Sequence, residues 1–136
     1  MAGLKRSGSL LAIETLKRRS QFLYVRGGLR YSTPGFILEA REQRDGTTAS
    51  GPRFGFTVSR RIGTAVARNR ARRRLRAAVA ELAQEHAERS FDYVLIARSQ
   101  ALDRTFDLLK GDLETGFSRI RAQARRKRVA EPAPRA

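Results

Sequence analysis

The spacing of the apolar residues changes within one continuous stretch of the chain. Over residues 53–59 large apolar side chains alternate with small or polar ones, which predicts a strand with one buried face. After Gly63 the apolar residues recur every three or four positions to about residue 89, as in a helix. Phe91–Ala97 is then almost entirely apolar and has the length of a central strand. A strand, a long helix and a second strand predict a β-α-β unit with parallel strands.

The other expected elements surround this unit in a single domain. Composition and periodicity place them over residues 16–122, between a flexible basic lead-in at 1–15 and a basic tail at 123–136 that we expect to be disordered. The expected elements are a short helix that Ser20 caps and that runs to Arg26, a strand near 29–32, a strand over 36–40, and a helix from about residue 103 or 105. The fold class is therefore α/β or α+β.

Positive charge is concentrated in the same central stretch. The chain carries 29 lysines and arginines against 13 acids, a formal charge of +16, which is typical of a nucleic-acid-binding protein. Nine arginines fall within residues 53–76, and no acid lies between Asp45 and Glu81. Because like charges one turn apart on a helix repel, this density indicates a polyanionic partner that neutralises it.

The long helix is expected to have one buried and one cationic face. Its apolar stripe is mostly alanine, which suits close contact with a sheet. The opposite face carries Asn69, Arg70, Arg73 and Arg76, with Arg68, Arg72 and Arg74 on the flanks.

A membrane surface is an alternative polyanion, since basic amphipathic helices also bind lipid. The apolar stripe lacks Trp and Phe, which disfavours this alternative. No segment of the sequence has the length and apolarity of a membrane span, and the apolar run at 10–13 is too short for a signal peptide. Without cysteine the chain fits a reducing compartment. We therefore expect a cytoplasmic protein with no membrane partner.

The acidic residues do not form a catalytic pattern. A metal-dependent nuclease needs two or three converging carboxylates, whereas the acids near 81–88 and 103–112 fit solvated or capping positions on helices. His86 is the only histidine and has no adjacent nucleophile. We predict no catalytic residue and no metal ligand in the protein. A DNA-reading helix is disfavoured because the short turn and second helix of a helix-turn-helix are missing.

Three blocks of the sequence resemble the bacterial ribonuclease P protein subunit. Residues 54–76 read F-G-F-T-V-S-R-R-I-G-T-A-V-A-R-N-R-A-R-R-R-L-R and are similar to the signature of that family, with its R-N-R box at 68–70. Residues 16–22, L-K-R-R-S-Q-F, resemble the entry to its first helix. Residues 91–98, F-D-Y-V-L-I-A-R, resemble the strand after its long helix. The resemblance covers about residues 16–120.

This resemblance implies both a fold and a function. The fold is an α+β sandwich in the order α-β-β(-β)-α-β-α, with a mixed sheet and a left-handed β-α-β crossover, as in the second domain of a small-subunit ribosomal protein. The function is that of the protein subunit of a ribonucleoprotein that cleaves precursor tRNA to make the mature 5′ end. The catalytic RNA would carry the chemistry with Mg²⁺, and the protein would join it as a monomer, one per RNA, without a cofactor of its own.

Two groups of site residues also follow from the resemblance. The group that would contact the catalytic RNA is Arg68, Asn69, Arg70, Arg72, Arg73 and Arg76. The group that would line a cleft for the single-stranded 5′ leader of precursor tRNA is Phe22, Arg26, Thr57, Ser59, Arg60, Arg61 and Arg98. Phe22 is equally compatible with a core position.

The chain departs from many relatives at two positions where they carry aromatic residues, Arg26 and Glu39. The arginine can stack on a base or hold a phosphate, whereas Glu39 would repel the leader unless it is paired or holds a metal ion. The competing hypotheses are a structural ribosomal RNA-binding protein, which charge and fold alone would fit, and a stand-alone nuclease, against which the acid pattern counts.

Overall fold

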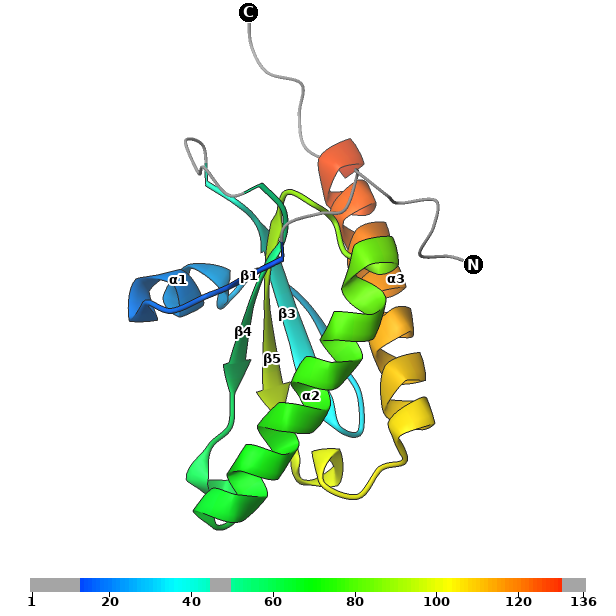
Figure 1. The fold of residues 1–136 in the computed structure, drawn as a ribbon. Coiled ribbons are helices and arrows are strands. Elements are labelled where there is room, and N and C mark those ends of the chain that lie inside the picture. Colours follow the sequence, from blue (N-terminus) through cyan, green and yellow to red (C-terminus); the bar gives the residue numbers. More distant parts are fainter. Residues whose placement is uncertain (1–12, 45–49, 131–136) are drawn as a thin grey trace, which may run out of the picture.

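The computed structural model describes residues 13–44 and 50–130 of the 136-residue chain. A five-stranded sheet in the order β1-β4-β5-β3-β2 separates the two long helices, α2 and α3, from the short helix α1 (Figure 1). The elements are β1 (Glu14–Thr15), α1 (Arg19–Val25), β2 (Leu29–Ser32), β3 (Phe36–Glu42), β4 (Arg53–Thr57), α2 (Ala65–His86), β5 (Phe91–Ala97) and α3 (Phe106–Ala130).

The predicted β-α-β unit is present as β4, α2 and β5. β4 and β5 are adjacent and parallel, with Phe54 opposite Tyr93 and Phe56 opposite Leu95. In Figure 1 both strands point downward, α2 lies in front of the sheet, and β5 lies to the right of β4. This arrangement makes the crossover left-handed. Because β3 runs antiparallel to β5, and β2 antiparallel to β3, the sheet is mixed. The α+β sandwich that the family resemblance implies is thus confirmed.

The main core lies between the sheet and the two long helices. The residues that α2 buries are small or medium in size: Ala71, Leu75, Ala78, Val79 and Ala83. They face a cluster of three buried rings, in which Phe54 stacks on Tyr93 at 5.0 Å and Phe117 of α3 meets Tyr93 edge-on at 5.1 Å. Each such ring contributes about 1.5–3 kcal/mol through burial. Large rings on the sheet therefore complement alanines on the helix.

A smaller core lies on the other face of the sheet, under α1. Leu16, Val25 and Val94 are buried there, and Phe22 of α1 packs against them. Gly55 of β4 permits this contact, because a Cβ atom at that position would lie 2.5 Å from the Phe22 ring. The absence of a side chain at residue 55 therefore fixes how closely α1 approaches the sheet.

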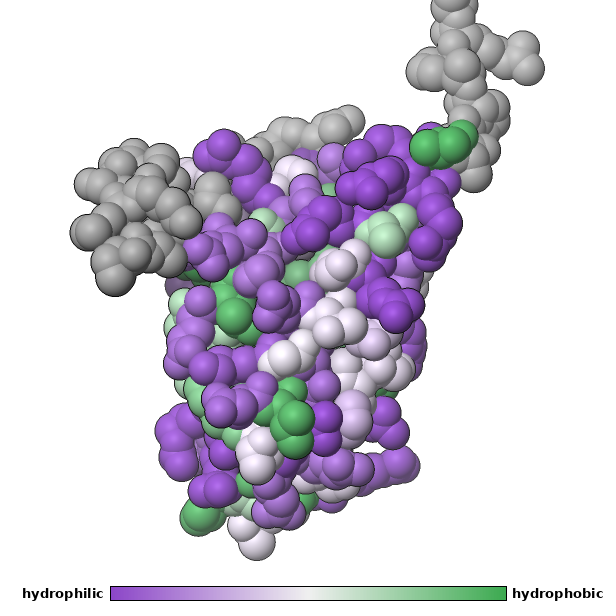
Figure 2. All heavy atoms as spheres, turned by 90° about the vertical axis from the view of Figure 1, so that its right-hand side faces the viewer, coloured by the Kyte–Doolittle hydropathy of each residue, from purple (hydrophilic) through white to green (hydrophobic). Residues whose placement is uncertain are grey.

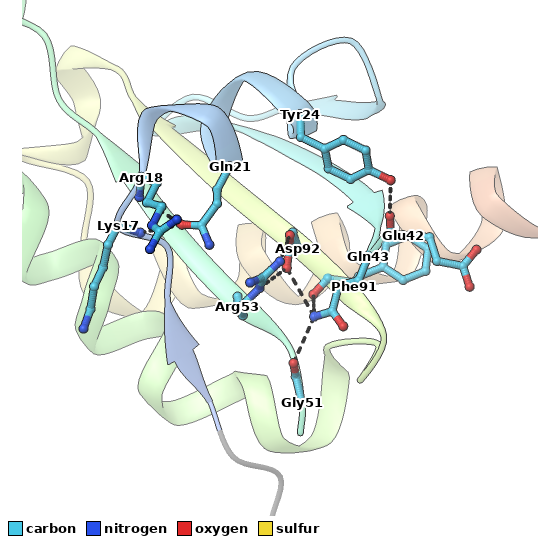
Figure 3. A network of polar contacts seen from close by, with 10 residues as sticks. All are labelled: Lys17, Arg18, Gln21, Tyr24, Glu42, Gln43, Gly51, Arg53, Phe91 and Asp92. Carbon is cyan, nitrogen blue, oxygen red and sulfur yellow. Dashed lines mark hydrogen bonds and ion pairs between the residues drawn. The ribbon is translucent and has the colours of Figure 1, made fainter. Parts of the chain in front are cut away.

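A buried ion pair connects the beginnings of β4 and β5 (Figure 3). Asp92 is 1% exposed and accepts hydrogen bonds from Arg53 Nε at 2.8 Å and Nη2 at 2.7 Å. Gln43, just beyond β3, donates to the same carboxylate at 3.2 Å and to the Gly51 carbonyl at 3.0 Å. The hydrogen bond to Asp92 raises the pKa of the Arg53 guanidinium. Arg53 thus stabilises the fold, although the sequence groups it with the arginine-rich stretch.

The beginning of α1 differs from the prediction. The helix starts at Arg19, and Ser20 does not cap it. The side-chain oxygen of Gln21 instead accepts hydrogen bonds from the backbone N–H groups of Lys17 and Arg18, both at 2.9 Å. The helix ends at Val25, one residue before the predicted end, and the predicted stop at Gly27 has a φ of +86°, a conformation that favours glycine.

Regular structure extends beyond both predicted domain boundaries. β1 lies inside the expected flexible lead-in of 1–15, because its backbone pairs with β4. α3 continues to Ala130 through part of the expected disordered tail of 123–136, because residues 121–130 are mostly strong helix formers and Ala124 still packs on the core. Residues 1–12 and 131–136 lie outside the described residues. At β4 the prediction was too long, since the strand ends at Thr57.

The contact between Gly55 and Phe22 yields a stability prediction. Gly55→Ala should lower the free energy of unfolding by about 1–3 kcal/mol, because the new methyl group displaces the Phe22 ring. Gly111→Ala, in α3, has no atom within 4 Å of the added Cβ and should raise that free energy by about 0.5–1 kcal/mol. Urea unfolding measures the free energy of unfolding of both variants. Equal changes in this free energy would contradict the close contact between Gly55 and the Phe22 ring.

Candidate nucleic-acid interface

A short turn, a glycine with positive φ and a capping threonine precede α2. The chain leaves β4 through a short 3-10 turn, Arg60–Ile62, and reaches Gly63, whose φ of +143° is one that side-chain-bearing residues rarely adopt. Thr64 then caps α2, with its hydroxyl oxygen accepting from the Ala67 N–H at 3.2 Å. No acidic residue lies in the first turn. The positive end of the helix dipole therefore adds to the charge of the arginines that follow.

The predicted arginine face is exposed on α2, as the helical period indicated. Asn69, Arg70, Arg73 and Arg76 are exposed, and Arg68 and Arg72 are half-buried. We call these six residues the arginine face. Its internal contacts involve neutral acceptors: Arg68 donates to the Gly63 carbonyl at 3.0 Å, Arg70 to the Leu102 carbonyl at 3.2 Å, and Arg72 to Asn69 Oδ1 at 3.2 Å.

Carboxylates pair with other cations instead. The lysines and arginines that form ion pairs with acids are Arg30, Arg53, Arg104, Lys110 and Arg121. Among the described residues, no ion pair involves the arginine face. Arg68, Arg70 and Arg72 are thus held in place while the charge of the face stays uncompensated by the described carboxylates, as a phosphate-binding surface requires.

Arg74 lies in the same run of arginines but has a structural position. Its Nε donates to the Ala101 carbonyl at 2.9 Å, and its Nη2 donates to the Arg104 carbonyl. These contacts attach the 3-10 turn Ser99–Ala101 and the segment after it to α2. Local sequence does not reveal this difference, because the acceptors are backbone groups 27 and 30 positions away.

The second predicted group gathers mainly where β4 and β5 end. Thr57 pairs in register with Ile96, and Ser59 and Arg98 each follow two residues later, so their positions adjoin. Arg60 and Arg61 belong to the adjoining 3-10 turn. All five of these residues are exposed, and Arg98 is fixed by its donation to the Thr33 carbonyl at 2.9 Å. We call Thr57, Ser59, Arg60, Arg61 and Arg98 the strand-end group.

Phe22 and Arg26 of the predicted leader cleft come from α1. Phe22 is half-buried and packs against the small core. Ile96, which pairs with Thr57 in the sheet, packs against the same core. Arg26 is exposed at the end of α1. Phe22 is therefore partly a core residue.

Glu39 is buried on the same sheet face and is paired. It is 6% exposed and lies 3.4 Å from Arg30 Nη1, on the strand position directly opposite. Because Arg30 compensates its charge, Glu39 meets the first condition stated above, under which it would not repel the leader. The β2–β3 register brings the two residues together, and only a correct hairpin alignment could have revealed this from sequence.

Residues 13–44 and 50–130 contain no group of three or more His, Cys, Asp or Glu side chains placed to hold a metal ion. His86 Nε2 lies 3.8 Å from a Glu114 oxygen. In the same part of the chain, no helix is both long and apolar enough to cross a membrane. Figure 2, which views the molecule from the α3 side, shows a mostly hydrophilic surface with small separate hydrophobic patches.

The arginine face and the strand-end group adjoin at one end of the molecule, because the turn that follows β4 leads directly into α2 (Figure 1). An α+β fold with this uncompensated cationic surface defines the class as a nucleic-acid-binding protein.

Comparison with known proteins specifies the family within this class. The sequence model of the Ribonuclease P family matches residues 11–121. A ribonuclease P protein component from Paramagnetospirillum magneticum is 44% identical over 113 residues, which cover 81% of this chain and 84% of the relative. One from Brucella suis is 40% identical over 117 residues, with 82% and 81% covered. The chain therefore belongs to the ribonuclease P protein family.

A solved structure agrees with this assignment. The RNase P protein from Thermotoga maritima superposes with a TM-score of 0.65 at 26% identity, covering 78% of this chain and 96% of that protein.

The contrast between Arg74 and its neighbour Arg73 can be measured. Arg74→Ala should lower the free energy of unfolding by about 1–3 kcal/mol, because it leaves the carbonyls of Ala101 and Arg104 without their donor. Arg73→Ala should change it by less than about 0.5 kcal/mol, because that side chain is exposed. Chemical denaturation followed by circular dichroism provides the test. A larger loss of unfolding free energy for Arg73→Ala than for Arg74→Ala would contradict the structural position assigned to Arg74.

Proposed function

We propose that this chain is the protein subunit that helps ribonuclease P remove the 5′ leader from precursor tRNA. The observation that carries the proposal is the arginine face, six residues on one helix that pair with no described carboxylate. Three of them, Arg68, Arg70 and Arg72, are oriented by neutral acceptors. Family membership indicates which polyanion this face meets. In this proposal the partner is the catalytic RNA, with one protein monomer per RNA, in the cytoplasm.

The chemistry is assigned to the RNA and its Mg²⁺. The two surfaces described above offer cations, hydroxyl groups and an aromatic ring. These groups bind phosphates and bases and increase the local concentration of substrate. The protein's contribution is then to position the RNA strands, and the metal ions that activate water are held mainly by RNA.

The two surfaces have different tasks in this proposal. The arginine face, on a helix that is fixed against the core, suits the backbone of a folded RNA. The strand-end group, with Phe22 and Arg26, suits a single strand of variable sequence, because hydroxyl groups, guanidinium groups and a ring edge contact any nucleotide. The strand that fits is the 5′ leader of precursor tRNA.

Reconstitution tests the proposal directly. Purified protein should restore cleavage of precursor tRNA by the cognate catalytic RNA at low Mg²⁺, and the protein alone should not cut. A structural ribosomal RNA-binding protein would instead copurify with ribosomal RNA and be indifferent to leader length. Lack of stimulation in the reconstituted reaction would reject the proposal.

The arginine face should control assembly with the catalytic RNA. Replacing both Arg68 and Arg70 by alanine should weaken binding by about tenfold or more and reduce the slope of log affinity against log salt by about 2, since two phosphate contacts are lost. Arg89→Ala, an exposed arginine beyond α2, is the control and should leave binding nearly unchanged. Filter binding at several salt concentrations measures both quantities. An equal loss of affinity for Arg89→Ala would mean that overall charge, and not the arginine face, determines binding.

Phe22 should affect a different step. Phe22→Ala should mainly weaken the affinity of the assembled ribonucleoprotein for precursor tRNA with a long leader, by about 1–3 kcal/mol for one lost stacking contact. Its effect on a substrate with a one-nucleotide leader should be small, and this substrate also controls for any loss of protein stability. Equal losses on both substrates, or a loss confined to assembly, would contradict the division between the two surfaces.

A further inference from the structure

A second basic cleft lies near the other end of the molecule, where α1, the end of β3 and the last turns of α3 meet. It has a volume of about 170 Å³, and its lining includes Tyr24, Arg41, Glu42, Phe91, Lys127 and Arg128. We call it the C-terminal cleft. Arg128 also lines an adjoining cleft with Arg121 and Arg125, so the basic surface continues along α3.

Tyr24 organises the cations on one side of the C-terminal cleft. Its hydroxyl donates to the Glu42 carbonyl at 2.8 Å, which fixes the ring (Figure 3). The guanidinium carbons of Arg41 and Arg44 lie 4.2 and 4.3 Å from the ring centre, and Arg41 also donates to the Tyr24 carbonyl at 2.9 Å. The ring attracts both guanidinium groups and so holds two positive charges in an orientation that an anion can bind.

The described acids do not neutralise this cleft. Arg41, Arg44, Lys127 and Arg128 form no ion pair with any carboxylate in residues 13–44 and 50–130. Asp92 is paired with Arg53, and Glu88 with Arg121. Glu42 is the one acid in the lining, so three cations, Arg41, Lys127 and Arg128, face one carboxylate. Arg44 lies on the Tyr24 ring and lines a neighbouring pocket, where Asp92 is already paired with Arg53.

The C-terminal cleft is separate from both surfaces assigned above. Tyr24 lies about 160° around α1 from Phe22 and Arg26, so the cleft and the proposed leader surface are on opposite sides of that helix. α2 is about 33 Å long for its 22 residues, and its arginine face is at the far end. Lys127 and Arg128 also lie beyond residue 121, where the match to the family ends.

We propose that the C-terminal cleft binds backbone phosphates of the catalytic RNA in the assembled ribonucleoprotein. Guanidinium groups fixed beside an aromatic ring favour phosphate with its forked geometry. A large folded RNA can contact both ends of the protein, whereas a leader bound on the other side of α1 would have to pass around that helix. The inference rests on the proposed function, and it adds a second anchor on the same RNA.

Arg128 and Arg126 provide a matched comparison. Both are exposed arginines in the last turns of α3, but they point about 160° apart, and only Arg128 lines the C-terminal cleft. Binding of each full-length variant to the catalytic RNA should be measured without substrate at several salt concentrations. Arg128→Ala should weaken binding by about tenfold and reduce the salt slope by about 1. Arg126→Ala should behave nearly like the unaltered protein.

Four results would overturn the inference. Equal losses for the two variants would mean that only overall charge matters. A loss for Arg128→Ala that appears only in the affinity of the assembled particle for precursor tRNA would make the cleft a substrate site. Unaltered binding by Arg128→Ala and by Arg44→Ala, beside normal binding and cleavage by the unaltered protein, would reject the anchor while the proposed function stands. Failure of the unaltered protein to bind the catalytic RNA would reject both.

Discussion

The close contact of α2 with the sheet determines where the functional residues lie. The buried side of this helix is mostly alanine, so the helix can rest directly on the rings of Phe54 and Tyr93. That stripe leaves no room inside for the long side chains of the same helix, and they must project to its other sides. A packing requirement for small residues on one side of α2 thus produces an arginine surface on the other.

The distribution of acids then separates structural cations from binding cations. Arg53, Arg104 and Arg121 each meet a carboxylate, and Arg74 meets backbone carbonyls. These side chains connect strands, turns and helices of the fold. Among the described arginines that have no carboxylate partner, two groups stand out, one along the first half of α2 and one around Tyr24. The molecule therefore carries uncompensated positive charge at both ends, although its arginines are spread through the sequence.

Local pattern predicted most of this architecture. The change of period after Gly63 located β4, α2 and β5, and the helical spacing identified the buried and exposed sides of α2. The features that local pattern did not predict depend on residues that are distant in the sequence or on how elements pack. The ion pairs of Asp92 and Glu39 follow from strand register, and the capping by Gln21 follows from how α1 docks. The continuation of α3 differs from the prediction because a run of basic residues is also typical of a disordered tail, although these residues are good helix formers.

The first turn of α2, which has no acid to balance its arginines, also has a consequence for the protein before assembly. Repulsion among these charges lowers the stability of the free fold, and an RNA that binds only the folded chain would stabilise it by an amount that grows with the logarithm of the free RNA concentration. Folding and assembly would in this way form one coupled equilibrium. Chains made in excess of such an RNA would spend more time unfolded and be more exposed to proteolysis.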